Sequence, residues 1–424
     1  MSNKKKIIGF DSWLGGARSY QILLPALEAE CIDMKLVHIS SWGNNVSCAS
    51  ESKVGDLICR DISFYGKNNF EGMLDIEKPD VVILTSTDTF AHRAIIRYCA
   101  QRSIPTLNLY HGVRSVIDAE DELGSPNIPF LAYIKNISSR LLKLIIHTFP
   151  VYMLSLWKTK ASFKDWIRFF TDVLHFAIGR DPAYVRASND SETSKCAVYV
   201  DADVKHAMSC YGFQHEDVLV VGNPDFSHFG MQQSLINSWS HPLDTTKKSI
   251  MYIETGFSSV GFYFASTQEF IEHLLHTSSS LDEQGFDMLL KMKPGQLNEK
   301  EILKGISGSQ IKLVGNETFL ESLTSCSGCI AERTSLALLP ALMGMPLFLA
   351  KYGPLEPVAY GSVLKSYPQS SELFDISDLT TVLNQFKSDL DVAIVKEWID
   401  TNSGPVPFEE MPERVVALIS SMIT

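Results

Sequence analysis

The sequence predicts an α/β protein made of two domains, each with a mainly parallel sheet. The chain has 424 residues, which is enough for two or three domains with substantial cores. Continuous apolar runs, such as residues 81–84, are typical of strands that helices cover on both faces. These runs alternate with stretches of helical periodicity, an order that is typical of βαβ units.

Residues 328–349 show this pattern most completely. A strand is followed by a polar turn, a short apolar helix that stops at Gly344, and a second buried strand. Thr334 or Ser335 can cap the helix, and a helix that begins at the carboxyl end of a parallel strand can bind an anion. The turn consists of Glu332, Arg333, Thr334 and Ser335.

The composition limits the classes of function. A formal net charge of -12 argues against nucleic acid as the general partner, because phosphate neutralisation needs a basic surface. The eight cysteines show no disulfide or zinc spacing; Cys326 and Cys329 form a Cys-x-x-Cys pair, but no second ligand pair lies nearby. No apolar region of signal-peptide length precedes the first strand, so we expect a cytoplasmic protein.

The first strand, residues 6–10, leads into a turn with two glycines, followed by a helix over 19–30 and a strand over 34–39. Gly15 and Gly16 allow backbone amides to approach a ligand closely. The Gly-x-Gly-x-x-Gly fingerprint is missing, so nicotinamide binding has little support. Arg18 would suit an anionic ligand, although a solvated arginine is the simpler interpretation.

A histidine follows the strand predicted over 104–109. His111 and Gly112 come at the carboxyl end of this strand, where doubly wound proteins bind ligands, and Arg114 lies just beyond. Histidine can exchange a proton near neutral pH. We therefore favour a functional role for His111 over a structural one.

The segment 116–190 interrupts the alternating pattern. Residues 144–157 form an uncharged run of fourteen residues with an internal proline, which is too short for a spanning helix of roughly 20 residues. Apolar residues between 163 and 177 fall at helical spacing. Between residues 135 and 172, around the uncharged run, seven basic residues against two acidic ones give a charge of +5: Lys135, Arg140, Lys143, Lys158, Lys160, Lys164 and Arg168, against Asp165 and Asp172. The segment is either an amphipathic, membrane-associating helix or a helical subdomain packed on the core.

Polar residues also follow the strands of the second half. Glu254 ends a strand, and small residues with accessible amides follow it, as a phosphate site would require: Thr255, Gly256, Ser258 and Ser259. Lys293 follows a strand that begins at Asp287 and supplies positive charge. Asp225 lies in a Gly-Asn-Pro-Asp sequence that is typical of a hinge.

Together, the His-Gly strand end, the Gly222-Asn-Pro hinge, the Lys293-Pro turn and the Glu-Arg-Thr-Ser helix start resemble bacterial surface-polysaccharide glycosyltransferases with two facing Rossmann-like domains, the GT-B fold. The CDP-glycerol (teichoic-acid) and Kdo/capsule transferases are the nearest in pattern. The resemblance implies an N-terminal acceptor domain (1–115 and 191–235), a helical insertion (116–190), a nucleotide-sugar donor domain (240–400) and a C-terminal helix (405–424) that braces the first domain.

The resemblance also implies roles for the candidate residues. His111 would act as general base, and amides around 255–259 and 333–335 with Lys293 would stabilise the departing phosphate. Glu332 would hydrogen-bond the sugar or ribose, and Asp225 or Glu254 would be the nucleophile if the reaction retains configuration. Gly15, Gly16, Arg18 and Arg114 would contact the acceptor.

Two departures from the family pattern are clear. Gly295 replaces a histidine in the Lys-Pro-His-Pro motif, and Leu339-Pro340-Ala341 stands where many relatives have a ribose-binding Leu-Glu-Ala. The expected activity is transfer of a sugar, or a polyol phosphate, from a nucleotide-activated donor to a hydroxyl of a surface polysaccharide or a lipid-linked glycan, without a metal or other cofactor. The expected partners are the donor, a glycan or polyprenyl-linked acceptor and, peripherally, the inner membrane. A nonhydrolysing UDP-sugar 2-epimerase and a non-catalytic sugar-nucleotide binding scaffold are the alternatives.

Overall fold

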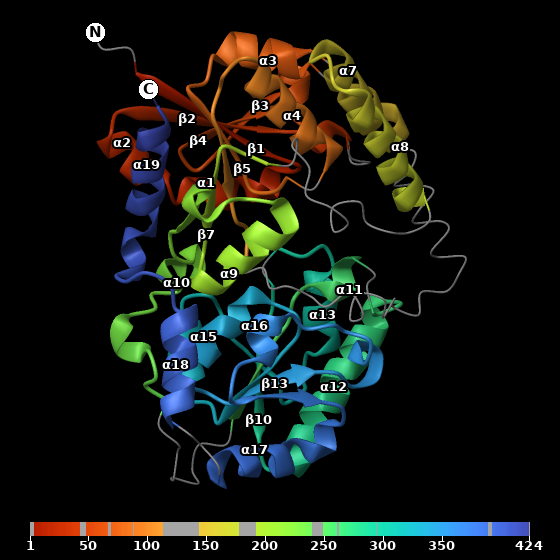
Figure 1. The fold of residues 1–424 in the computed structure, drawn as a ribbon. Helices are drawn as coiled ribbons and strands as arrows, with labels where there is room; N and C mark the ends of the chain where they lie inside the picture. The colour runs from red at the N-terminus through yellow and green to blue at the C-terminus, as the bar shows by residue number, and fades with distance from the viewer. Residues whose placement is uncertain are drawn as a thin grey trace. The chain divides into compact units, whose positions relative to one another are not determined.

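The computed structural model describes residues 4–42, 48–66, 69–87, 89–112, 144–177, 192–239, 249–260, 263–293, 295–388 and 392–423 (Figure 1). These residues group into two compact units. Unit 1 contains the described residues up to 112, together with 144–224 and 409–423, and unit 2 contains those from 225 to 408. The boundary therefore falls between Pro224 and Asp225, earlier than the position near residue 235 that the sequence suggested.

Unit 1 is built on an eight-stranded sheet with the order β3-β4-β2-β1-β5-β6-β7-β8. All neighbouring strands run parallel except β3, which is antiparallel to β4. The strands are β1 (Lys5–Asp11), β2 (Ile32–His38), β3 (Glu51–Val54), β4 (Leu57–Asp61), β5 (Val81–Leu84), β6 (Thr106–Leu109), β7 (Lys195–Val198) and β8 (Val218–Val220). The buried runs that predicted β1, β5 and β6 do form central strands, as expected for a doubly wound sheet.

Helices cover both faces of this sheet. Successive β1 residues point to opposite faces, so Ile7 contributes to one apolar core and Ile8 to the other. The first core includes residues of α1 (Ala17–Gln21), α2 (Leu24–Ala29) and α19 (Met411–Met422), and α9 (Asp201–His206) is partly buried against it. The second core includes residues of α3 (Phe70–Glu77), α4 (Phe90–Gln101), α7 (Phe149–Lys158) and α8 (Phe163–Ala177).

Two local predictions for unit 1 need correction. The helix expected over 19–30 forms as two short helices, because Pro25 cannot donate a backbone hydrogen bond and lies in the first turn of α2. The hairpin of β3 and β4 was not predicted. β3 has only exposed or partly exposed residues, and β4 buries only alternate residues, so neither strand has the continuous buried run that marks the central strands.

The C-terminal helix α19 belongs to unit 1. Met411 and Val415 are fully buried in its core, and Arg414 donates a hydrogen bond through Nε to the carbonyl oxygen of Val221 at 2.8 Å. The end of the chain is thereby attached to the last strand of the first sheet.

Part of the segment 116–190 lies within the described residues and is helical. A π-helical turn (Leu144–Thr148) leads into α7, and α8 follows; both helices lie side by side at the outer edge of unit 1, coloured yellow in Figure 1. Arg114, Lys135, Arg140 and Lys143 lie outside the described residues. None of the helices that the structure describes is long and apolar enough to cross a membrane.

Unit 2 contains a six-stranded parallel sheet with the order β11-β10-β9-β12-β13-β14. Its strands are β9 (Ser249–Ile253), β10 (Asp287–Lys291), β11 (Lys312–Leu313), β12 (Gly328–Ala331), β13 (Leu347–Ala350) and β14 (Ser370–Leu373). Its helices are α10 (Pro224–His228), α11 (Phe257–Val260), α12 (Thr267–Glu283), α13 (Glu299–Gly305), α14 (Phe319–Thr324), α15 (Leu338–Leu342), α16 (Ser362–Lys365), α17 (Leu379–Ser388) and α18 (Val392–Asn402). The prediction of two α/β domains with parallel sheets is confirmed.

Candidate functional site

Three neighbouring strands of unit 2 end in the residues that the sequence singled out. The strands β10, β9 and β12 are adjacent and parallel, so the loops that follow them meet at one edge of the sheet. Glu254 follows β9, Lys293 lies two residues after β10, and Glu332 follows β12. The carboxyl edge of a parallel sheet is where doubly wound proteins bind ligands.

Glu332 joins the end of β12 to the loop after β9. Its side chain is fully buried, and one carboxyl oxygen accepts hydrogen bonds from the backbone N–H and the hydroxyl of Thr255, at 2.9 and 2.7 Å. The other oxygen lies 3.0 Å from the hydroxyl of Tyr252. That hydroxyl also lies 3.1 Å from Nε2 of His273 on α12, so the contacts form a chain from Glu332 into the core.

Glu254 joins the loops after β9 and β10 in the same way. It is buried, and one carboxyl oxygen accepts from the backbone N–H of Gly256. The other oxygen accepts from the backbone N–H of Lys293 at 3.0 Å and from the side-chain amide of Gln296 at 3.2 Å. Gly256 has a positive φ of 86°, which a residue with a side chain rarely adopts. The two carboxyl groups therefore hold three loops in fixed positions.

Burial raises the pKa of both carboxyl groups. The pKa of Glu332 rises from its ordinary value of 4.5 to about 8 because of burial and the neighbouring charge of Glu254. Burial also raises the pKa of Glu254, against the lowering effect of its hydrogen bonds. Because burial and a like charge both disfavour the ionised form, the protonated form of Glu332 is favoured near neutral pH. Burial lowers the pKa of His273 to about 4, which leaves its ring neutral.

Two cationic side chains are exposed on the loops that these carboxyl groups hold. They are Lys293, after β10, and Arg333, after β12. Burial raises the pKa of the Tyr263 phenol, and the positive charge of Arg333 nearby opposes that rise. By contrast, Lys291 is buried and donates to the carbonyl oxygen of Met292 at 2.9 Å. The exposed cations are thus the ones available to an anionic ligand.

The serine and threonine candidates lie at the starts of short helical segments. Thr334 accepts a hydrogen bond from the backbone N–H of Leu336 at 3.2 Å, which confirms the predicted cap. Ser258 is buried in α11 and accepts from the side-chain amide of Asn298 at 3.2 Å. Ser335 is half-buried in the turn before α15, and Ser259 lies in α11.

Unit 1 has its own group of candidates at the carboxyl edge of its sheet. His111 follows β6, is exposed, and has Nδ1 3.1 Å from the hydroxyl of Ser19 on α1. Arg18 is exposed in the same helix. The structure therefore brings the histidine into contact with the helix that follows the loop after β1.

The glycines of that loop are required by close packing. A Cβ on Gly16 would lie 2.1 Å from a carboxyl oxygen of Asp11, and a Cβ on Gly15 would lie 2.5 Å from the ring of Trp13. Asp11 is buried and accepts from the Thr85 hydroxyl at 2.8 Å and from the backbone N–H of Trp13 at 3.3 Å. The loop is built around this carboxylate.

The surroundings of Glu254 and Glu332 change how these two predicted residues can act. Glu332 and Glu254 are enclosed and bonded to protein groups, which supports a positioning role in place of direct contact with a sugar or nucleophilic attack. Asp225 lies half-buried in the first turn of α10. Arg114 lies outside the described residues.

Sequence reasoning did not identify several residues that the structure adds. Tyr252 and His273 extend the contacts of Glu332, but inside a strand and a helix they look like ordinary core residues. Trp13 is largely exposed beside Gly15, and an exposed aromatic ring suits a sugar face. Its position just after a strand is a signal that the sequence did contain.

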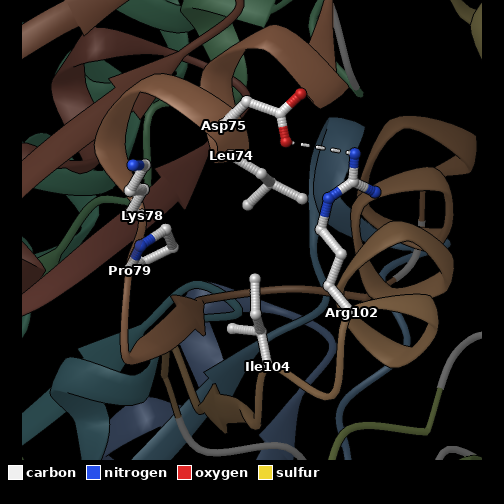
Figure 2. Close-up of a pocket in the computed structure, with 6 residues that line it drawn as sticks. All are labelled: Leu74, Asp75, Lys78, Pro79, Arg102 and Ile104. Carbon is white, nitrogen blue, oxygen red and sulfur yellow. Dashed lines mark hydrogen bonds and ion pairs between the residues drawn. The ribbon is translucent and has the colours of Figure 1, made fainter.

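A cavity of about 560 Å³ lies elsewhere, at the amino-terminal ends of β5 and β6. Figure 2 shows its lining, with Arg102 pointing toward Asp75 at 3.3 Å. The lining residues are Leu74, Asp75, Lys78, Pro79, Arg102 and Ile104. None of the predicted site residues is among them, so this cavity is separate from the candidate site.

In the described part of the chain, one group of side chains has the spacing of metal ligands. His38, Cys48 and Asp61 offer ligand atoms within 4.8 Å of one another. Burial would raise the pKa of Asp61, but hydrogen bonds from His38, Ser41 and Ser63 hold it well below its usual range. Nδ1 of His38 lies 3.3 Å from a carboxyl oxygen of Asp61, so direct contact between these two side chains accounts for part of this arrangement.

No protein-family model matches the chain, and no curated protein matches it in sequence. Among solved structures, it is similar to CalG4, the calicheamicin glycosyltransferase, with a TM-score of 0.53 at 12% identity over 100% of this chain and 98% of that chain. For the wall teichoic acid polymerase TagF the TM-score is 0.51 at 11% identity, over 99% and 89%. For the UDP-GlcNAc 2-epimerase of Methanocaldococcus jannaschii it is 0.47 at 13% identity, over 98% and 99%. The first two likenesses confirm the predicted GT-B fold.

The buried carboxyl pair predicts a pH dependence of stability. Because folding raises the pKa of Glu332 from 4.5 to about 8, its protonated form is favoured in the folded state. The contribution of this carboxyl group to the free energy of unfolding is complete below the unfolded pKa. It is lost as the pH rises toward 8, by at most ~1.4 kcal/mol per pH unit. In urea unfolding between about pH 5 and pH 8, Glu332→Gln should remove much of this slope. The exposed Glu301→Gln is the control, and an unchanged slope in Glu332→Gln would contradict the assignment.

The loop after β1 predicts that Gly16→Ala is destabilising. The added Cβ meets Asp11, which Thr85 and Trp13 hold in place, so the loop must shift at a cost of about 1–3 kcal/mol. The midpoint of urea unfolding should fall accordingly. Gly315→Ala is the control, because its Cβ would meet only Thr318, at 3.8 Å, and a Gly16→Ala variant as stable as that control would refute the prediction.

Proposed function

We propose that the protein is a nucleotide-sugar-dependent glycosyltransferase. It moves a sugar, or a polyol phosphate, from the nucleotide to a hydroxyl of a growing surface polysaccharide or a lipid-linked glycan. The observation that carries this proposal is the pair of exposed cations, Lys293 and Arg333, on loops that buried Glu254 and Glu332 hold at the carboxyl edge of the second sheet. A fold shared with CalG4 and TagF supports it.

The donor's phosphates bind at this edge in the proposed mechanism. Lys293 and Arg333 neutralise the phosphate charge, which grows on the leaving oxygen as the bond to the sugar breaks. The two buried glutamates keep the loops from rearranging, so the cations are already oriented before the donor arrives. Positioning of this kind lowers the barrier because the protein does not have to reorganise during the reaction.

His111 is the proposed general base. A neutral ring whose Nδ1–H donates to the Ser19 hydroxyl has its acceptor lone pair on Nε2, the nitrogen that can take a proton. As the acceptor hydroxyl forms its bond to the transferred group, its proton passes to His111, and the bond to the nucleotide phosphate breaks. Trp13 and Arg18, exposed around the neighbouring loop, are proposed to contact the acceptor glycan.

The donor site predicts selective nucleotide binding. In a thermal-shift panel of UDP, GDP, CMP, CDP and TDP, one nucleotide should raise the melting temperature, since ligand at a hundred times its Kd stabilises by about 2.7 kcal/mol. Lys293→Ala and Arg333→Ala should each weaken that nucleotide about 10- to 100-fold, because each removes a charge-assisted contact.

Lys300→Ala is the matched control, an exposed lysine on α13 of the same unit. Its affinity should equal that of the unmodified protein. If none of the five nucleotides shifts the melting temperature, the donor proposal fails.

The role of His111 predicts a loss of turnover without a loss of donor binding. His111→Ala should lower kcat about 10²- to 10⁴-fold, the usual contribution of a general base, with unchanged nucleotide affinity. The assay follows nucleotide release from the donor, with and without a glycolipid extract as acceptor source. His215→Ala is the control, an exposed histidine elsewhere in unit 1.

The same assays distinguish a glycosyltransferase from an epimerase and from a non-catalytic scaffold. Conversion of the sugar nucleotide without acceptor would indicate an epimerase, and nucleotide binding without any turnover would indicate a scaffold. Equal turnover of His111→Ala and His215→Ala would remove His111 from the mechanism.

A further inference from the structure

The helices α7 and α8 expose a large apolar surface. Trp157 is 70% exposed and Phe163 is 80% exposed, and seven other large apolar residues of the same helical segment are also exposed. We call this set the outer apolar surface: Ile145, Ile146, Met153, Leu154, Trp157, Phe163, Ile167, Phe170 and Leu174. Soluble proteins rarely expose so many large apolar side chains in one place.

The outer apolar surface is not needed to anchor the helices. Their opposite sides already pack on unit 1, where Tyr152 of α7 and Phe169 of α8 lie 5.0 and 5.4 Å, between ring centroids, from Phe90 of α4. Arg93 of α4 also pairs with the buried Asp172 of α8 at 3.0 Å. The helices are therefore held through one side and present a second apolar side to solvent.

The spacing places the exposed residues of α8 on one stripe. Phe163, Ile167, Phe170 and Leu174 recur at intervals of four, three and four residues, so they lie above one another along the helix. On α7, the residues that are exposed rather than partly buried are all apolar: Pro150, Met153, Leu154 and Trp157. Figure 1 shows the two helices side by side at the outer edge of unit 1.

Positive charge accompanies this surface. Lys160 lies in the turn between the helices and Lys164 in the first turn of α8, and both are exposed. Residues 144–177 contain four Lys and Arg against two Asp, a charge of +2, in a chain whose total is -12. Lys158 and Arg168 are partly buried and pair with Glu71 and Asp172.

We propose that the outer apolar surface docks into the interface of a lipid bilayer with anionic headgroups. Apart from the partly buried Lys158, the exposed and partly exposed side chains of α7 are apolar, and Trp is favoured at the level of the headgroups. The adjacent lysines complement anionic lipid. Since neither helix can span a membrane, both lie along its surface.

Vesicle binding tests this proposal without donor or acceptor, so its result does not depend on the proposed transferase activity. The full-length protein is sedimented with vesicles of phosphatidylcholine alone and of phosphatidylcholine mixed with phosphatidylglycerol. It should bind the mixed vesicles more tightly. The double variant Trp157→Ser/Phe163→Ser should bind them at least about tenfold more weakly, because it removes two inserted rings.

Two further variants provide a control and a test of the charge contribution. Phe374→Ser removes an aromatic ring that is 62% exposed in unit 2 and should bind vesicles like the unmodified protein. Lys160→Glu/Lys164→Glu should lose about tenfold or more on mixed vesicles and little on phosphatidylcholine. All variants should keep their melting temperature, since the altered side chains are exposed.

Three results would overturn the proposal. The first is no binding to either vesicle, and the second is equal binding by Trp157→Ser/Phe163→Ser and the unmodified protein. The third is concentration-dependent dimerisation, lost in that double variant and accompanied by no vesicle binding, which would assign the surface to a second copy of the chain.

Discussion

The candidate donor site depends on two carboxyl groups buried at the ends of neighbouring strands. Burying a carboxylate is unfavourable unless hydrogen bonds or a proton compensate; Glu254 and Glu332 both accept hydrogen bonds, and burial raises the pKa of each. Their oxygens bind backbone N–H groups of Thr255, Gly256 and Lys293, so the loops after β9 and β10 are tied to each other and to β12. Lys293 and Arg333 are held at the carboxyl edge of the second sheet because the buried glutamates fix the loops that carry them.

In unit 1, too, a buried carboxylate at the end of a strand holds the loop that follows. Asp11 is buried at the end of β1 and holds the following turn, and Gly16 is needed because nothing larger fits against it. His111 reaches this turn through Ser19, so a residue from the end of β6 and a loop from the end of β1 form one surface. Two local sequence signals, a histidine after one strand and glycines after another, are brought near each other through this contact.

The sequence-based predictions agree best with the structure where strands are buried on both faces or where a hydrogen bond joins close neighbours in the chain. Strands with continuous apolar runs, such as β5, were predictable because both of their faces are covered, and the Thr334 cap was predictable because its bond spans two residues. The β3–β4 hairpin was missed because β3 has no buried residue and β4 buries only alternate residues, so neither strand carries a continuous buried run. Glu254 and Glu332 were correctly placed at strand ends, but the sequence suggested ligand contact where the structure shows internal bonding.

The sequence by itself determined the α/β class, the order of the main strands and the strand ends that carry polar residues, because periodicity and turn residues act over a few positions. The tertiary structure decided which of those residues are buried and which are exposed. Glu332 and Lys293 look equally polar in sequence, yet one is enclosed by Tyr252 and Thr255 and the other faces solvent. Burial depends on neighbours from distant parts of the chain, and it sets both the protonation of an acid and its access to a ligand.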